Sequence, residues 1–505
     1  MKQHIKRLGK DSVIYGLGDA LKRLVTFLLL PVYTRYLTPT DYGRLEILMI
    51  TSSILFTIGS QGMNSAFARS YAFSKSESQR SLLIRTSHYY LIFSACIIFG
   101  LLHLFSKPLS TVLFNQDNSS LSTLVRILAF TSLFQIVSII PFSLYRVKSQ
   151  PLKYIRVSLI GFFLQAILNV IFVAVLKIGV KGVLLGNAAS AFVVVILNIF
   201  SIRNITFFTF SFPKLKDLLM FGLPLIPAGI FSWLMHFSDK YLLQRFTSAH
   251  EVGLYSVGSR FSNILSLLII VPFMMSWSAY AFQIAASDHA KQTFKTVATY
   301  LLFILCSLGL CLIVFTPVVI KLMANDQFWD AHKVVLPLVY AGIVYGMLCI
   351  FNLGIHIAKK THYFLYVMCF GAFFNIMFNI LFIPKYGMIG AGFISFATNL
   401  VITFITYQIS QKLYYVPYEK GRFLKIALVF IIASGSSRVF EMPNMYLDIL
   451  FRTVLMISFF LSLYLAKFFD KREIDLIKRT CYGLIQQKGI YNKIKFGYER
   501  IRIRS

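Results

Sequence analysis

The sequence has little negative charge, and only 14% of its 505 residues are charged at all. Soluble chains of ordinary composition carry about 25% charged residues, so this scarcity argues against a large soluble domain. The six cysteines form no Cys-x-x-Cys pair and no Cys/His cluster, which predicts neither a disulfide framework nor a metal site. A small-residue cleavage site near the N-terminus is also missing, so we expect nothing there to be removed.

Long apolar runs fill the chain instead, and 57% of the residues are hydrophobic. Runs of about 20 residues are long enough to cross a bilayer core as α-helices. We therefore predict an all-α polytopic membrane protein with about fourteen transmembrane helices. These spans are expected at residues 13–36, 42–62, 86–106, 121–144, 154–176, 182–202, 215–237, 251–274, 294–319, 334–357, 362–383, 387–410, 423–440 and 446–466.

Positive charge alternates between the connecting loops. The net charge is +31, which in a soluble protein would suggest a nucleic-acid partner. Here the loops on one side carry 23 Lys and Arg before the tail, against 12 on the other side. The positive-inside rule explains this asymmetry and predicts cytoplasmic N- and C-termini, with no nucleic acid bound.

The chain resembles itself at an offset of about 210 residues. Gly43 pairs with Gly253, and the segment from Gly161 matches the segment from Gly371. Within the second pair, Gln165, Asn169, Phe172, Gly179 and Gly182 correspond to Asn375, Asn379, Phe382, Gly387 and Gly390. Six spans per copy is an even number, so both copies share one orientation and form a parallel repeat. We predict an N-lobe at 1–209, a C-lobe at 210–412, two further spans at 413–467 and a basic cytoplasmic tail at 468–505.

Two stretches carry a family resemblance. "GLGDALKRLVTFLLLPVYTRYLTPTDYGRLEIL" and "GSQGMNSAFARSYAF" resemble the start of the polysaccharide transporter family. Its members flip lipid-linked oligosaccharides and belong to the multidrug/oligosaccharidyl-lipid/polysaccharide exporter superfamily. The resemblance implies two six-helix lobes around a cationic cavity and a groove beside spans 13–14 for a polyprenyl tail. It also implies coupling to a proton or sodium gradient or to the membrane potential, with no bound cofactor.

Three charges in the first span are the leading candidates for substrate binding. Asp19 lies three residues before Lys22 and four before Arg23, so it can pair with either on one helical face. One carboxylate leaves one cation in excess, and charge at this depth usually faces an aqueous cavity. We expect Lys22 and Arg23 to meet the diphosphate of a lipid carrier. The alternative is a structural ion pair with a lysine that extends to the cytoplasm.

Five assignments complete the candidate site. Arg260 has no acidic neighbour at helical spacing and is expected to contact phosphate or sugar, unless it pairs with Asp239 or Glu251 in the folded protein. Arg69 is expected at the cytoplasmic rim, and Asp19 is the candidate for ion coupling. Pro224 and Pro227 mark the seventh span as the bending helix.

Other polar residues in the spans are expected to have structural roles. Glu46, Asp239 and Glu251 lie near outer span ends and are expected to be solvated. Gln165, Asn169, Asn375 and Asn379 are expected to make interhelical hydrogen bonds.

We expect a flippase that moves undecaprenyl-diphosphate-linked oligosaccharide repeat units to the outer leaflet by alternating access, for O-antigen (lipopolysaccharide), capsule or exopolysaccharide synthesis. The alternative is a cation-coupled exporter of drugs or amphiphiles. An enzyme is not expected, because the chain lacks a large external loop and an Asp-x-Asp motif. The expected location is the bacterial plasma (inner) membrane, and the expected partners are membrane lipids, the lipid-linked oligosaccharide, a polysaccharide polymerase and chain-length machinery.

Overall fold

Helices account for the secondary structure of every described segment of this computed structural model. The described residues are 16, 18, 21–22, 25–116, 118–202, 209–285, 287–439, 445–470, 473 and 475, and no strand occurs among them. Contacts divide the chain into two compact units. Unit 1 comprises residues 1–288 and 316–415, and unit 2 comprises residues 289–315 and 416–505.

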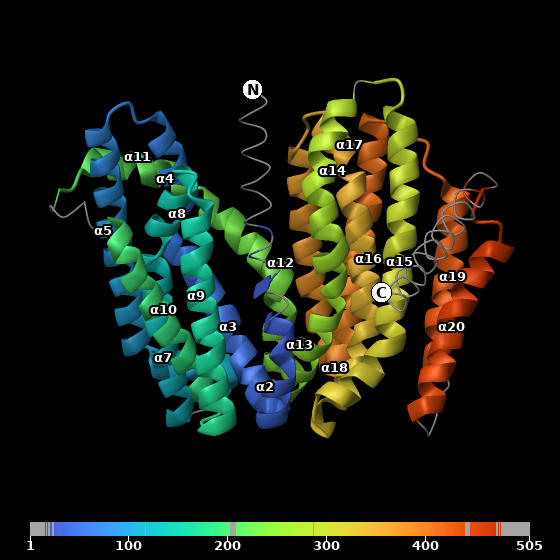
Figure 1. Cartoon of the computed structure of the whole chain (residues 1–505), viewed down its shortest axis with the longest axis horizontal. Helices are drawn as coiled ribbons and strands as arrows, with labels where there is room; N and C mark the ends of the chain where they lie inside the picture. The colour runs from blue at the N-terminus through green and yellow to red at the C-terminus, as the bar shows by residue number, and fades with distance from the viewer. Residues whose placement is uncertain are drawn as a thin grey trace, which may run out of the picture. The chain divides into compact units, whose positions relative to one another are not determined.

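The helices of residues 1–209 all belong to unit 1 (Figure 1). They are α2 (Leu30–Tyr36), α3 (Pro39–Ser60), α4 (Met63–Phe73), α5 (Glu77–Leu104), α6 (Ser106–Phe114), α7 (Ser119–Val137), α8 (Ile139–Val147), α9 (Pro151–Val170), the π-helical turn η1 (Ile171–Val175) and α10 (Val180–Ile202). Four of these helices form a row of neighbours: α5 packs on α7, α7 on α10, and α10 on α9.

The helices that follow belong partly to each unit. They are α11 (Phe212–Gly222), α12 (Leu225–Phe246), α13 (Ala249–Ser262), the π-helical turn η2 (Ser266–Ile270), α14 (Val271–Ile284), α15 (Ala290–Met323), the 3-10 helix η3 (Asp326–Val334), α16 (Val335–Phe351), α17 (Leu353–Ile357), α18 (His362–Leu413), α19 (Lys420–Val439) and α20 (Met445–Leu465). Most of α15 belongs to unit 2, together with α19 and α20. Figure 1 shows α19 beside α20, and the two pack directly together.

Two helix starts about 210 residues apart have the same kind of N-cap. Thr38 accepts a hydrogen bond from the Asp41 N–H at 3.1 Å at the start of α3. Ser248 accepts one from the Glu251 N–H at 3.3 Å at the start of α13, 210 residues later. Both are N-caps that satisfy a backbone donor which has no partner within the helix.

A second pair of equivalent positions repeats a rare backbone conformation. Gly179 has φ +65° before α10, and Gly387 has φ +53° inside α18. Residues with a Cβ rarely adopt this left-handed region, so glycine is favoured at both turns. Gly387 divides the 52-residue α18 into the two predicted spans, 362–383 and 387–410, and gives the C-lobe the same break that Gly179 gives the N-lobe.

The count of fourteen spans is not confirmed. Within the described ranges, ten helical stretches are long and apolar enough to cross a membrane, and one of them is α18 with its two spans. The predicted first, seventh and thirteenth spans are not among the ten. The first is described only in part, at residues 16, 18, 21–22 and 25–36, the seventh is divided into α11 and α12, and α19 forms the thirteenth with several Ser and Gly residues in its second half.

Helices α3 and α13 make a close backbone contact between the two segments that resemble each other in sequence. A Cβ on Gly43 would lie 1.8 Å from the Ala249 carbonyl oxygen, and a Cβ on Gly253 would lie 2.0 Å from the Pro39 carbonyl oxygen. Neither neighbour is a flexible side chain that can move aside. The paired glycines therefore set how closely the N-lobe and C-lobe approach at this junction, which we call the α3–α13 junction.

Replacing Gly43 with alanine should weaken the α3–α13 junction. The methyl group overlaps backbone, and overpacking of this kind costs about 1–3 kcal/mol. The thermal unfolding temperature of the purified protein should fall. The Gly100→Ala variant is the control, because a Cβ there meets nothing within 4 Å and alanine is the better helix former. Equal unfolding temperatures for the two variants would contradict a tight contact at Gly43.

The seventh predicted span is broken into α11 and α12. Helix α11 ends at Gly222, and Pro224 immediately precedes the first residue of α12. Figure 1 shows α11 beside α4, and the two helices pack together. A Cβ on Gly62 would lie 2.4 Å from the Gly222 carbonyl oxygen, so α11 also approaches the N-lobe backbone closely.

Candidate functional site

A cluster of charged side chains lies across the α3–α13 junction. Glu46 of α3 accepts hydrogen bonds from Arg260 of α13 at 2.8 Å and from Lys240 of α12 at 3.2 Å. The side chain of Glu46 is only 13% exposed, and that of Lys240 is 12% exposed. Glu46 follows Pro39 by seven residues, about 10 Å along the helix, so the cluster lies well inside the bundle. We call these three residues the junction triad.

Aromatic rings and a second carboxylate surround the junction triad. The Arg260 guanidinium lies 5.3 Å from the centre of the Tyr42 ring, which is fully buried. Asp239 accepts a hydrogen bond from the Lys240 N–H at 2.8 Å and another from the Tyr255 hydroxyl. Two cations thus share one directly paired carboxylate, while the neighbouring carboxylate is held by a backbone amide and a phenol.

The structure corrects several expectations for these residues. Arg260 pairs with Glu46 from another helix, rather than lacking an acidic partner or pairing with Asp239 or Glu251. Glu46 and Asp239 are half-buried and paired rather than freely solvated, because α3 packs against α12 and α13. Glu251 was also expected to be solvated, but its Oε2 accepts the Met388 N–H at 2.8 Å and so caps the helix that follows Gly387.

The candidates in the first span are only partly described. Lys22 lies in a helical segment and donates a hydrogen bond to the Ser158 hydroxyl of α9. A Cβ on Gly18 would meet Ile155 of the same helix at 3.2 Å, so the described part of this span lies against α9. Asp19 and Arg23 lie outside the described residues, and their predicted roles stay predictions.

Arg69 lies at a different contact from the junction triad. Its exposed side chain lies on α4, with the guanidinium 5.7 Å from the centre of the Phe73 ring and 4.9 Å from that of Phe221 on α11. Pro224 and Pro227 are both exposed, and Pro224 lies at the break between α11 and α12. Their place at a break agrees with a bent helix, and the predicted hinge motion stays a prediction.

The predicted polar contacts between helices are present in both copies of the repeat. Asn169 of α9 lies 3.0 Å from the Tyr33 hydroxyl of α2 and 3.1 Å from Asn187 of α10. In the second copy, Asn375 of α18 accepts a hydrogen bond from Ser238 of α12 at 3.3 Å. Asn379 and Gln165 extend the two networks, donating to Asn375 and Asn187 respectively. The bonds of Asn169, Gln165 and Asn375 join helices, as the sequence predicted, whereas Asn379 bonds within α18 and no described residue hydrogen-bonds to its Oδ1.

An apolar groove lies between α19 and α20 in unit 2. Its volume is about 330 Å³, and apolar side chains line it together with three serines. The lining residues are Val429, Ile432, Ala433, Ser436, Phe451, Val454, Leu455, Ser458, Phe459 and Ser462. A groove of this composition accommodates hydrocarbon, and it lies in the helices where the resemblance implied a site for a polyprenyl tail.

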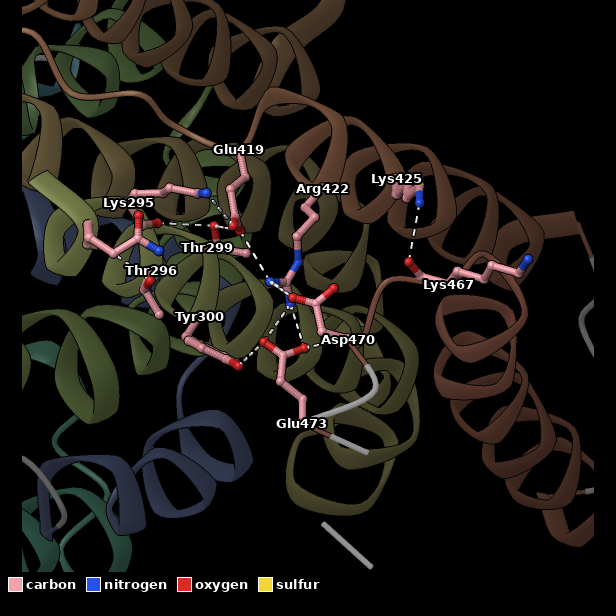
Figure 2. Close-up of polar contacts among 11 residues, drawn as sticks. Lys295, Thr296, Thr299, Tyr300, Glu419, Arg422, Lys425, Lys467, Asp470 and Glu473 are labelled. Carbon is pink, nitrogen blue, oxygen red and sulfur yellow. Dashed lines mark hydrogen bonds and ion pairs between the residues drawn. The ribbon is translucent and has the colours of Figure 1, made fainter. Parts of the chain in front are cut away.

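A second ionic cluster ties together the parts of unit 2, as Figure 2 shows. Glu419, just before α19, accepts hydrogen bonds from Thr299 of α15 at 2.8 Å and from Arg422 of α19 at 3.2 Å. Its other oxygen lies 3.2 Å from the Lys295 ammonium of α15. This carboxylate therefore links the ends of α15 and α19.

Arg422 extends the same cluster to the segment that follows α20. It donates to Glu473 at 2.9 and 3.1 Å, and its guanidinium lies 4.5 Å from the centre of the Phe468 ring. Glu473 also accepts hydrogen bonds from the Tyr300 hydroxyl and from the Asp470 N–H. Figure 2 shows Arg422 between Glu419 and Glu473, so one arginine fastens the start of the tail to α19.

The attachment at Glu473 should depend on pH. Burial alone would raise the pKa of Glu473. Hydrogen bonds from Tyr300, the Asp470 backbone and Arg422 outweigh that effect, so the pKa lies below the ordinary 4.5. Because the folded state favours the ionised carboxylate, its stabilisation is complete above pH 4.5 and is lost as the pH falls below that value. Protection of the Phe468–Asp470 amides from hydrogen exchange, measured relative to their intrinsic rates, should fall in that acidic range.

The Glu473→Gln variant should show fast exchange already at neutral pH, because it lacks the charge. The Asp470→Asn variant is the control, since that side chain is 75% exposed and lies 3.9 Å from Arg422. If the acid-induced loss of protection persisted unchanged in Glu473→Gln, a titratable group other than Glu473 would be its cause.

Sequence reasoning missed Lys240 and the partnership between Glu46 and Arg260. The internal sequence similarity could have indicated that Glu46 and Arg260 lie together. Glu46 follows Gly43 by three residues and Arg260 follows Gly253 by seven, so each acid or base shares a helical face with its glycine. If the paired glycines are assumed to pack together, the two side chains must face each other.

Comparisons with known proteins agree with this arrangement of helices. The fold matches a structure titled "Lipid II flippase MurJ, inward closed conformation" with a TM-score of 0.70 and 15% identity. The match covers 88% of this chain and 98% of that one. A multidrug resistance MATE family transporter of the MOP superfamily, in an inward-facing conformation, matches with a TM-score of 0.60 and 16% identity over 78% of this chain and 97% of its own. The Vibrio cholerae MATE transporter VcmN matches with a TM-score of 0.55 and 16% identity over 81% and 96%. At these identities the likeness establishes the fold.

The fold is therefore the all-α polytopic fold of these flippase and MATE transporter structures. Residues 8–285 match the family described as "Polysaccharide biosynthesis protein", which is more than half of the chain, so the protein belongs to this family. An uncharacterized membrane protein of Methanocaldococcus jannaschii is 27% identical over 194 residues. That match spans 36% of this chain and only 36% of the relative.

Proposed function

We propose that the protein flips polyprenyl-diphosphate-linked oligosaccharide from the cytoplasmic to the outer leaflet by alternating access. The observation that carries the proposal is the junction triad, where Lys240 and Arg260 share one carboxylate between the two copies of the repeat. The triad by itself has two cations for one carboxylate, which favours an anionic substrate, and a diphosphate suits the donor fork of an arginine. Lys22, Arg23 and Arg69 would add to this cationic lining.

The lipid part of the substrate would lie in the α19–α20 groove. Its apolar lining suits a polyprenyl chain, whereas a soluble sugar nucleotide has no segment to place there. Membership of a polysaccharide biosynthesis family supports an oligosaccharide on the other end of the diphosphate. The products would serve O-antigen, capsule or exopolysaccharide synthesis, together with a polymerase and chain-length proteins.

The proposed setting is the bacterial plasma membrane, with both termini in the cytoplasm as the loop charges indicate. In that orientation the α3–α13 junction lies towards the outside. A proton or sodium gradient would drive the cycle, with Asp19 as the coupling carboxylate and the break at Pro224 and Pro227 as the hinge of α12.

Deletion of the protein in its native host tests the function. A flippase deletion should leave the lipid-linked oligosaccharide on the cytoplasmic leaflet, and extracted lipids should contain more of it. Surface polysaccharide should disappear and return on complementation. Normal amounts of the intermediate and of the surface glycan would contradict the proposal.

The second candidate function is export of drugs or amphiphiles, which the likeness to MATE transporters favours. The same deletion separates the two functions. Loss of an exporter should raise sensitivity to cationic dyes and leave the lipid-linked intermediate unchanged. The excess of cations at the junction triad argues against a cationic cargo.

A further inference from the structure

A small polar pocket of about 220 Å³ lies beside the α3–α13 junction, and both copies of the repeat line it. The N-lobe contributes Thr40 and Arg44 of α3 and residues 114–116, which end and follow α6. The C-lobe contributes Gln244 of α12 and residues 247–250, at the start of α13. The pocket is distinct from the junction triad, whose residues do not line it.

The arginines at this pocket are already engaged with neighbouring side chains. Arg44 donates to Gln116 Oε1 at 3.2 Å and lies 4.0 Å from an Asp41 oxygen. Arg245, next to the pocket, donates to the Asn115 side-chain oxygen. Their positive charges therefore lie against polar acceptors, and the pocket is not lined by cations that await an anion.

Gln244 places a buried acceptor without a described partner at this pocket. It is only 7% exposed, and no described residue hydrogen-bonds to its Oε1. An unpaired acceptor at this depth is costly, and each such group in a native protein calls for an explanation. Because Gln244 lines the pocket, a ligand there can supply the missing partner.

The chemistry of Gln244 selects the ligand. An ionised carboxylate and the diphosphate of a lipid carrier offer only acceptors, so neither pairs with Gln244 Oε1 in the orientation found here. A sugar hydroxyl both donates and accepts, and it satisfies the amide in either orientation of its oxygen and nitrogen. Thr40 adds a half-buried hydroxyl of the same kind to the wall. The pocket is smaller than the roughly 300–1,000 Å³ of sites for drug-sized ligands, which suits a single ring.

We propose that this pocket binds one neutral sugar residue, held through its hydroxyls by Gln244 and Thr40. Because a bound sugar contacts both copies of the repeat, it stabilises the closed α3–α13 junction over any state in which that junction opens. The sugar would come from the transported glycan, so the source of the ligand, but not its binding, rests on the proposed function.

Sugar binding can be measured on the purified full-length protein in nanodiscs. Glucose, galactose and N-acetylglucosamine are titrated while the thermal unfolding temperature is followed, with inorganic phosphate as the anionic comparison. At least one neutral sugar should raise the unfolding temperature with a saturating dose response. A rise that never saturates is the general effect of an excluded osmolyte and would overturn the proposal.

The Gln244→Met variant removes the amide at similar size and should bind the sugar about tenfold more weakly, the loss expected for a hydrogen bond. Thr40→Val, which keeps the shape of its side chain, should weaken binding in the same direction and serves if Gln244→Met does not fold. Exposed Gln292→Met is the control and should bind as the parent does.

Equal binding by the parent, Gln244→Met and Thr40→Val would overturn the site, and so would saturable stabilisation by phosphate alone. The readout does not require transport. A deletion strain with normal lipid-linked intermediates would therefore reject the proposed function and leave the proposed sugar site standing. Absence of saturable sugar binding would reject the sugar site and leave the proposed function standing.

Discussion

Replacing Glu46 with glutamine should sharply destabilise the protein and stop transport. The change leaves Lys240, 12% exposed, and Arg260, 27% exposed, with no directly paired carboxylate. Removing one partner of a fully buried ion pair costs about 3–5 kcal/mol, and the partial exposure of Arg260 reduces that cost. The thermal unfolding temperature should fall by more than for any other single charge removal on α3. The measurement is thermal unfolding in nanodiscs, beside surface glycan in cells.

Asp41→Asn is the matched control, because Asp41 lies on the same helix and faces an arginine too. Its carboxylate is 37% exposed and lies 4.0 Å from Arg44, one turn away on α3 itself. Exposed pairs of this kind contribute about 0–1 kcal/mol. If Glu46→Gln lowered the unfolding temperature no more than Asp41→Asn does, the junction triad would contribute no more to stability than an exposed ion pair.

A triple variant separates the structural role of the triad from its role in transport. Glu46→Leu, Lys240→Met and Arg260→Met together replace every charge by an apolar side chain of similar size. Such replacements are often neutral or stabilising, so the unfolding temperature should recover. Surface glycan should stay absent, since the cations proposed to meet the diphosphate are gone. Recovery of both would make the triad purely structural.

The sequence predicted the class of fold because that information is local. Apolar runs of span length, turn residues between them and the self-similarity from Gly161 to Gly371 are all readable along one chain. The positive φ values at Gly179 and Gly387 follow from the same alignment, since glycine at both positions of a repeat indicates a backbone requirement. These features depend on neighbouring residues and on the bilayer.

The charged site was predicted less well because its partners are far apart in sequence. Glu46 and Arg260 are separated by 214 residues, and their pairing depends on how α3 packs against α13. Helical spacing could find Asp19, Lys22 and Arg23 as neighbours, but it is silent on contacts between helices. The same limit explains why Glu46 and Asp239 were expected in water, since depth in a bundle is set by packing rather than by position in a span.

Replacing both Lys22 and Arg23 with alanine should abolish surface glycan while the protein still inserts into the membrane at normal levels. Each charge-assisted contact to a diphosphate is worth about 1.5–3 kcal/mol, so losing two should slow translocation on the order of a hundredfold or more. The measurements are surface glycan by gel and lipid-linked oligosaccharide in extracts, normalised to protein in membranes.

Ser158→Ala supplies the comparison that separates charge from anchoring. Ser158 accepts the hydrogen bond of Lys22, so the alanine variant removes that contact and leaves the cation in place. If the positive charge is what the diphosphate meets, Ser158→Ala and the charge-conserving Lys22→Arg should both keep most of the surface glycan. If Lys22 instead only fastens the first span to α9, Ser158→Ala should be as harmful as the double alanine variant. Normal glycan in the double variant would remove Lys22 and Arg23 from the site and leave the junction triad as the source of positive charge.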